Sequence, residues 1–133
     1  MEYCKIGGRK YDAIITAIEE TFNILYSENS GRTMSAGARM TLDPLGTFYG
    51  HKITFQRKQG KELEYDALFD FVSKPRYDGI PVELVHNQKT IKYDAYISQG
   101  TRRLKKIDEK SGKVYWGELV LNIIPMEAQV APE

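Results

Sequence analysis

The chain has 133 residues, 41% of them hydrophobic and 28% charged, a composition typical of an ordinary globular domain and not of a disordered or fibrous chain. Nineteen basic and eighteen acidic residues leave a net charge of +1, so no overall field steers the chain toward nucleic acid or an anionic membrane. The single cysteine, Cys4, excludes an internal disulfide, and no apolar run has the length of a signal peptide or membrane span. We therefore expect a cytoplasmic protein that needs no membrane.

The first predicted elements lie between residues 3 and 26. Tyr3 to Ile6 fits a short strand that ends at Gly7-Gly8, a pair suited to a two-residue hairpin turn. Residues 12–26 match a helical face and a strand face, so periodicity alone leaves helix or strand open. Six β-branched residues in this segment favour the strand, because branching at Cβ restricts rotamers in a helix.

The chain is expected to reverse at residues 27–31, a cluster of turn-forming residues. Residues 33–42 then alternate at period two, which predicts a half-buried strand that forms one long hairpin with residues 12–26. Asp43 to Gly46 is the next predicted turn. The clearest amphipathic strand follows, with one face made of Tyr49, His51, Ile53 and Phe55.

A helix is predicted at about residues 61–74, where the spacing of the apolar residues changes from that of a strand to that of a helix. Acidic residues near its start suit the positive end of the helix dipole, and Pro75 disfavours helical geometry at the residue before it. Its predicted apolar face consists of Leu63, Ala67, Leu68, Phe71 and Val72.

Two more hairpins are predicted in the second half of the chain. The first pairs residues 82–85 with 91–97, and the second pairs residues 101–107 with 114–124. The succession of elements predicts a mainly β fold, a β-sandwich or barrel of antiparallel hairpins with one packed α-helix. We expect one domain over residues 1–125 and a flexible C-terminal tail over residues 126–133.

No arrangement in the sequence indicates catalysis, a metal or a cofactor. Glu19-Glu20 and Asp108-Glu109 are adjacent carboxylates, but neighbours in a strand point to opposite faces and do not converge. His51 and His86 lie far apart, without Cys or His neighbours at ligand spacing. We therefore predict no enzyme and no cofactor. A catalytic role would need a cleft that gathers either histidine with a carboxylate from a distant strand.

The one concentrated charge patch lies in residues 102–106, near Tyr96 and Tyr115-Trp116. Its cations could bind phosphates while the aromatic rings stack on bases, which is the basis of an alternative function, a monomeric nucleic-acid-binding β-barrel. A solvated strand edge that blocks unwanted pairing explains the same charges. The candidate contact residues are Arg102, Arg103, Lys105 and Lys106.

Several stretches within residues 1–75 carry a resemblance to a known group of proteins. They are the short strand that ends at Gly7-Gly8, EETFNILYSENSGRTMSAGARM from Glu19 to Met40, DPLGTFYGHKITFQR from Asp43 to Arg57, and the helix YDALFDFVSKP. In this order they resemble phage and prophage tail proteins of the tail-tube-like group, which includes tail tubes and the N-terminal domain of distal tail proteins. A distal tail protein usually carries a further domain, which we do not expect here, so a tail tube, an adaptor or a baseplate component is expected.

The resemblance implies a β-sandwich with a helix on one side, in a structural subunit of a phage or phage-like tail. Such subunits form hexameric rings with copies of themselves and bind other tail or baseplate proteins, and nucleic acid only passes through the lumen. Residues 13–42 would be the lumen-side hairpin, in a virion tail or phage-like particle assembled in the bacterial cytoplasm. Its apolar face fits the domain's own core equally well. The candidate assembly residues are Glu28, Asn29, Arg32, Met34 and Met40.

Overall fold

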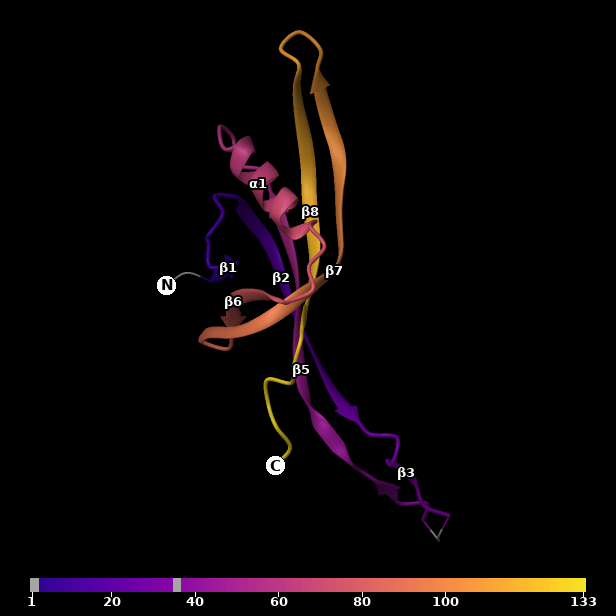
Figure 1. The fold of residues 1–133 in the computed structure, drawn as a ribbon. Helices are drawn as coiled ribbons and strands as arrows, with labels where there is room; N and C mark the ends of the chain where they lie inside the picture. Colours follow the sequence, from indigo (N-terminus) through magenta and orange to yellow (C-terminus); the bar gives the residue numbers. More distant parts are fainter. Residues whose placement is uncertain (1–2, 35–36) are drawn as a thin grey trace.

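A computed structural model describes residues 3–34 and 37–133, which form strands around one helix (Figure 1). In this part of the chain no helix has the length and hydrophobicity that crossing a bilayer requires. The elements in chain order are β1 (Cys4–Ile6), β2 (Ile14–Tyr26), β3 (Gly31–Arg32), β4 (Met40–Thr41), β5 (Pro44–Gln56), α1 (Glu62–Val72), β6 (Ile80–His86), β7 (Lys89–Asp108) and β8 (Lys113–Pro125).

Six strands form one antiparallel sheet in the order β1-β6-β7-β8-β5-β2, and β3 and β4 form a small hairpin of their own. The predicted mainly β fold with one helix is confirmed. The predicted barrel is wrong, because β1 pairs with β6 and β2 pairs with β5, which leaves these two strands at opposite ends of an open sheet.

The sheet curls so that its two ends face each other across one core. The His51 ring on β5 lies 3.1 Å from the carbonyl oxygen of Val85 on β6, although β7 and β8 separate these strands in the sheet order. Irregular pairing along β7 and β8 accompanies this bend, as β-bulges increase local twist. The residues of the core with at most 1% exposure are Ile6, Ile53, Tyr65, Leu68, Leu84, Ala95, Leu119, Leu121 and Ile123.

Helix α1 begins and ends close to the predicted positions, and four of the five residues of its predicted apolar face, Ala67, Leu68, Phe71 and Val72, are buried or pack against the core. Tyr65, Leu68 and Val72 point into the core, whereas Leu63 is 84% exposed. The Tyr65 hydroxyl donates a hydrogen bond to the carbonyl oxygen of Gly117 on β8 at 2.8 Å, so the polar end of a buried ring finds a partner there. The prediction that Leu63 belongs to the buried face is therefore wrong.

The strand predicted for residues 12–26 is confirmed as β2, but its partner is not the one expected. β2 pairs along its length with β5, from Ile14 opposite Gln56 to Tyr26 opposite Pro44. The hairpin that contains β2 therefore extends from residue 14 to residue 56, instead of residues 13–42. The turn predicted at residues 43–46 is also wrong, because β5 already begins at Pro44.

The strand predicted for residues 33–42 is wrong as well, although residues 35–36 lie outside the described part. Only Met40 and Thr41 are in a strand, the short β4. Gly37 and Ala38 have φ angles of 86° and 45°, which turn the chain at the tip of the hairpin. The alternating small residues resembled a strand in sequence, but no core lies beneath them.

Two long hairpins extend from the body in opposite directions (Figure 1). We call the hairpin of residues 21–50 the lower arm and that of residues 101–120 the upper arm. The two predicted C-terminal hairpins are confirmed, although one continuous strand of 20 residues, β7, serves both of them. The flexibility expected for residues 126–133 stays a prediction.

Candidate functional site

The most unusual surface of the molecule is the free edge of β2. This strand has 13 residues, hydrogen-bonds to β5 on one side only, and is exposed at every position except Ile18. Natural proteins usually blunt such an edge with charges, proline or bulges, because its unpaired backbone groups accept another strand. The pairing of β2 is irregular near Thr16 and between Leu25 and Tyr26, and the stretch from Ala17 to Leu25 is regular.

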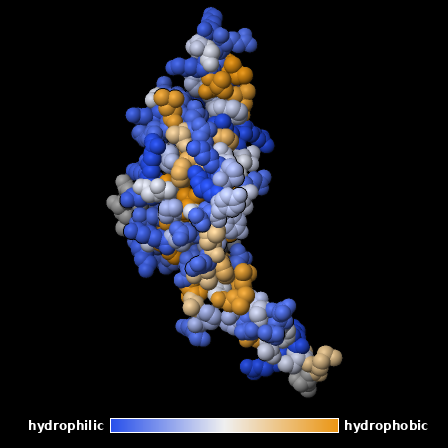
Figure 2. Space-filling view, in the orientation of Figure 1, coloured by the Kyte–Doolittle hydropathy of each residue, from blue (hydrophilic) through white to orange (hydrophobic). Residues whose placement is uncertain are grey.

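Exposed hydrophobic side chains gather on the lower arm near the body, and Figure 2 shows those on the face turned to the viewer. Phe22 shares a face with Tyr49 and is 64% exposed, while Leu25 shares the opposite face with Gly46 and is 47% exposed. Contiguous exposed apolar surface marks interaction sites in soluble proteins. The large exposed hydrophobic residues of this surface are Phe22, Ile24, Leu25, Tyr26, Leu42 and Leu45.

The five predicted assembly residues gather around the far end of the lower arm. Arg32 on β3 pairs with Met40 on β4, and Met34 in the tip is fully exposed. The alternative that these methionines belong to the domain's core is wrong. Glu28 and Asn29 are exposed in the turn that leads to β3. Their role in an interface stays a prediction.

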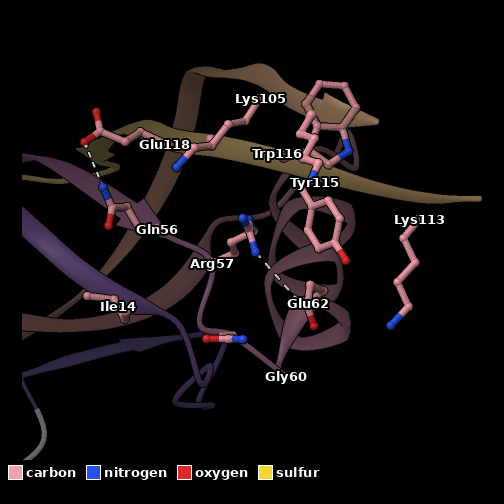
Figure 3. A pocket seen from close by; sticks show the side chains of 13 residues that line it. Ile14, Gln56, Arg57, Gly60, Glu62, Lys105, Lys113, Tyr115, Trp116 and Glu118 are labelled. Atoms are coloured by element: carbon pink, nitrogen blue, oxygen red, sulfur yellow. Dashed lines mark hydrogen bonds and ion pairs between the residues drawn. The ribbon is translucent and has the colours of Figure 1, made fainter. Parts of the chain in front are cut away.

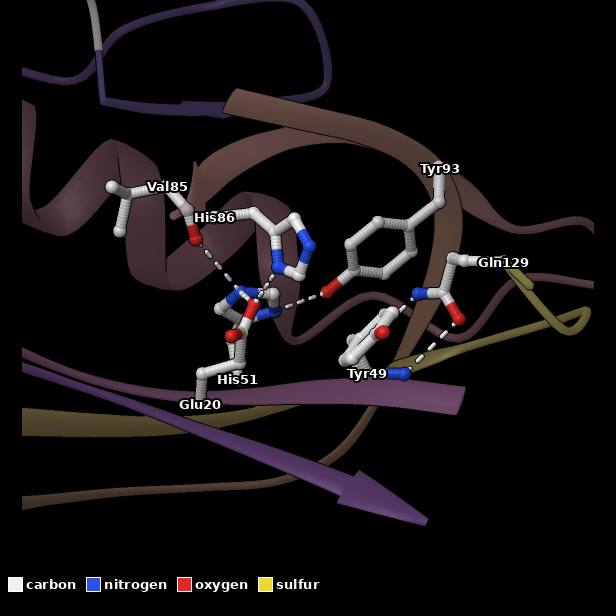
Figure 4. Close-up of polar contacts among 7 residues, drawn as sticks. All are labelled: Glu20, Tyr49, His51, Val85, His86, Tyr93 and Gln129. Carbon is white, nitrogen blue, oxygen red and sulfur yellow. Dashed lines mark hydrogen bonds and ion pairs between the residues drawn. The ribbon is translucent and has the colours of Figure 1, made fainter. Parts of the chain in front are cut away.

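A polar cluster holds β2 to the body at the base of the lower arm (Figure 4). The Glu20 carboxylate on β2 lies 3.1 Å from Nε2 of His51 and 2.7 Å from Nδ1 of His86. Nδ1 of His51 lies 2.7 Å from the Tyr93 hydroxyl. One carboxylate thus links the edge strand to β5 and to the last residue of β6.

The contacts of His51 define its protonation state. A carbonyl oxygen only accepts, so Nε2, 3.1 Å from the Val85 oxygen, carries a proton and donates it. Burial lowers the pKa of His51, which favours a neutral ring whose Nδ1 accepts from the Tyr93 hydroxyl. Burial raises the pKa of Tyr93, so this hydroxyl keeps its proton.

The sequence did not predict this cluster, in which one carboxylate contacts both histidines. The available signal was strand register, since Glu20 lies directly opposite His51 once β2 pairs with β5. Both ring nitrogens of His51 are occupied, and its side chain is fully buried. Over the described residues, no group of His, Cys, Asp and Glu is arranged to hold a metal ion. The geometry suits a structural tie between strands.

A cleft of about 970 Å³ lies between the start of α1 and the upper arm (Figure 3). Two of the predicted nucleic-acid contacts, Lys105 and Lys106, line it, whereas Arg102 and Arg103 do not. The sequence missed two other cations of the cleft, Arg57, which follows β5, and Lys113, which begins β8 after the turn of the upper arm.

Arg102 is part of the structure that packs α1 against the upper arm. Its guanidinium carbon lies 3.6 Å from the ring centre of Phe69 and 4.1 Å from that of Trp116. Its Nη1 lies 3.4 Å from a carboxylate oxygen of Asp66. These contacts occupy both the cation and the aromatic face that nucleic-acid binding would use. Arg103, the neighbouring residue, is exposed.

Comparison with known proteins identifies no relative of this chain. No protein-family model matches the sequence, and no curated protein matches it. The features from which a function can be inferred are therefore the chain's own: an open antiparallel sheet, an apolar lower arm and a long unpaired strand edge.

Proposed function

We propose that the chain is a structural subunit of a phage or phage-like tail, with a tail-tube-like fold, that acts by assembling into rings. The observation that carries this proposal is the free edge of β2, which continues without a covering element into the apolar lower arm. The position of the subunit would be a tail tube, a distal tail or baseplate component, or an adaptor.

The physical argument starts from what an edge strand and an apolar arm require. A free monomer leaves the backbone groups of β2 and the side chains of the arm in water, which invites uncontrolled pairing. A closed ring pairs each edge with the neighbouring subunit and leaves no free end, whereas an unclosed contact of the same type gives filaments. Ring formation therefore pairs the free β2 edge and at the same time prevents its uncontrolled pairing.

Ring assembly also explains the shape of the subunit. The two arms extend from opposite ends of the body, so neighbouring copies and other tail proteins can contact them without competing for the core (Figure 1). The sequence resemblance adds the expectation of a hexamer. Other tail or baseplate proteins would bind the ring faces.

The experiment that tests the proposal measures absolute mass by light scattering over a concentration series, with negative-stain images of the large species. We expect concentration-dependent rings, and Phe22→Ser should raise the midpoint concentration about tenfold, the effect of losing a modest interface contact. Leu63→Ser is the matched control, because Leu63 is also an exposed large hydrophobic residue, 84% exposed, but lies on α1. A wild-type chain that stays monomeric over the whole series would contradict ring assembly.

The cleft beside the upper arm favours a second candidate function, the binding of a polyanion such as nucleic acid. Lys105, Lys106 and Lys113 line it, and no ion pair to a described acidic residue within 4.0 Å engages them. Binding should weaken steeply with salt, and the double substitution of Lys105 and Lys106 by Ala should flatten the salt dependence. Binding to single-stranded DNA that ignores salt, or no binding, would exclude this candidate.

A further inference from the structure

The C-terminal segment lies against the outer edge of β5 at the base of the lower arm. β8 pairs with β5 only as far as His51. The chain then leaves β5 and returns to it farther along, so that Val130 lies opposite Thr47 in the same antiparallel sense. The Thr47 amide donates to the Val130 carbonyl at 2.9 Å, and the Val130 amide donates in return at 3.4 Å. Val130 thus occupies the place beside β5 that a further strand would take.

The side chain of Gln129 continues the pairing with β5 through two further hydrogen bonds. Its Oε1 accepts from the backbone amide of Tyr49 at 3.0 Å, and its Nε2 donates to the backbone carbonyl of Tyr49 at 3.1 Å (Figure 4). A backbone residue in a paired strand would make the same two hydrogen bonds. The amide side chain therefore satisfies a backbone position that no strand of this chain reaches.

Gly46 makes room for the same segment. A Cβ at this position would lie 2.6 Å from the Cβ of Ala128 and 2.9 Å from the carbonyl oxygen of Val130, and the φ angle of 147° is one that other residues rarely adopt. The C-terminal segment is thus held at one short stretch of the β5 edge by backbone hydrogen bonds, by a side-chain amide and by the space that a glycine leaves.

We propose that residues 128–130 are a cap on a strand-accepting edge, residues 46–49 of β5, and that the β2 edge of a second copy displaces this cap during assembly. The inference rests on the proposed ring function and adds its regulation. An edge of backbone amides and carbonyls takes an extended strand, and β2 is a long strand whose outer edge pairs with no described strand of the same chain.

The cap makes the two edges of the free subunit unequal, because one is open and the other is covered. With the cap in place, the lower arm offers β2 to a neighbour but has no accepting edge at its base. A second copy can join only when the cap leaves, and arm-to-arm pairing then repeats around the ring as a heterologous contact. The cap therefore sets the concentration at which assembly begins.

Two variants act on the cap in opposite directions. Gln129→Ala removes two hydrogen bonds and should lower the midpoint concentration of assembly about tenfold. The pair T47C and V130C locks the cap, because Cα atoms of a hydrogen-bonded antiparallel pair lie about 5.5 Å apart, within reach of a disulfide. The oxidised lock should suppress assembly and a reductant should restore it. Gln88→Ala, in an exposed turn, is the matched control.

A second measurement does not depend on self-assembly. A labelled peptide of residues 14–26 is titrated into each variant below the concentration at which rings form. We expect binding at least tenfold tighter to the Gln129→Ala chain than to the oxidised lock. Equal binding to both would overturn the cap, even if the wild type forms rings. Selective peptide binding without rings from any variant would support the cap and contradict the proposed self-assembly.

Discussion

Lowering the pH should reduce the free energy of unfolding through one residue, His51. Its ring is fully buried, and desolvation by burial lowers its pKa despite the nearby Glu20 carboxylate and the Val85 carbonyl, which both favour the charged form. The other titratable groups that face it are His86 at the end of β6 and Tyr93 on β7, with Cys4 of β1 behind the tyrosine.

The sign of the pH dependence follows from which state of the chain, folded or unfolded, binds a proton on His51 more tightly. In the unfolded chain His51 takes up a proton near its ordinary pKa of about 6.5, and in the folded chain it does so only at lower pH. The free energy of unfolding is therefore unaffected by this group above about pH 6.5 and falls as the pH drops from there to the folded-state pKa. The slope from one such group is at most about 1.4 kcal/mol per pH unit.

Urea unfolding of the wild type and of His51→Gln at several pH values between about 7 and 5 isolates this contribution. Glutamine keeps a donor and an acceptor but does not titrate, so the variant should be less stable at pH 7 and should lose less stability on acidification. His86→Gln is the control at the exposed side of the same cluster. Identical slopes for the wild type and the His51 variant would refute the argument.

Three further outcomes are expected from the packing. Leu121→Ala, at a side chain with 0% exposure, should cost about 2–5 kcal/mol in urea unfolding, and a loss below about 1 kcal/mol would mean that the core is not packed as described. Leu63→Ala should change stability by less than about 0.5 kcal/mol. Arg102→Ala should destabilise by about 1–2 kcal/mol, more than Arg103→Ala, and the reverse order would contradict the stacked position of Arg102.

Local pattern predicted most of the strands, because they cover a core. The alternation around Ile53 in β5 follows from a pleated surface with one buried face, whereas the β-branched residues of β2 form a strand that is exposed at every position except Ile18. The same reasoning failed at residues 33–42, since period two there reflects small residues on a hairpin tip without a core. Propensity cannot reveal where along a long hairpin the body of the protein ends.

The site was harder to predict, because its contacts are long-range. Glu20 and His51 meet only after β2 takes β5 as its partner, and the sequence favoured a different partner. The hydrogen bonds of Gln129 to Tyr49 join residues 80 positions apart, in a segment that composition marks as a tail. On the helix the errors are limited to Leu63, which is exposed, and to Tyr65, which is buried with its hydroxyl bonded to the Gly117 carbonyl.

Three strand edges of the body and the lower arm differ in how they are covered, and this difference is the main physical reason for the proposed assembly. In the upper arm, β7 after Ala95 and β8 before Leu119 also have free outer edges, which pair with no described strand. β1 is an edge of only three residues, and the C-terminal segment covers β5 at the base of the arm. β2 has neither protection: of its two charged residues, Glu20 turns inward to the histidines, and Phe22 to Tyr26 carries no charge and no proline. An edge left open and apolar in a chain that caps its other edge is best explained by a strand-pairing partner.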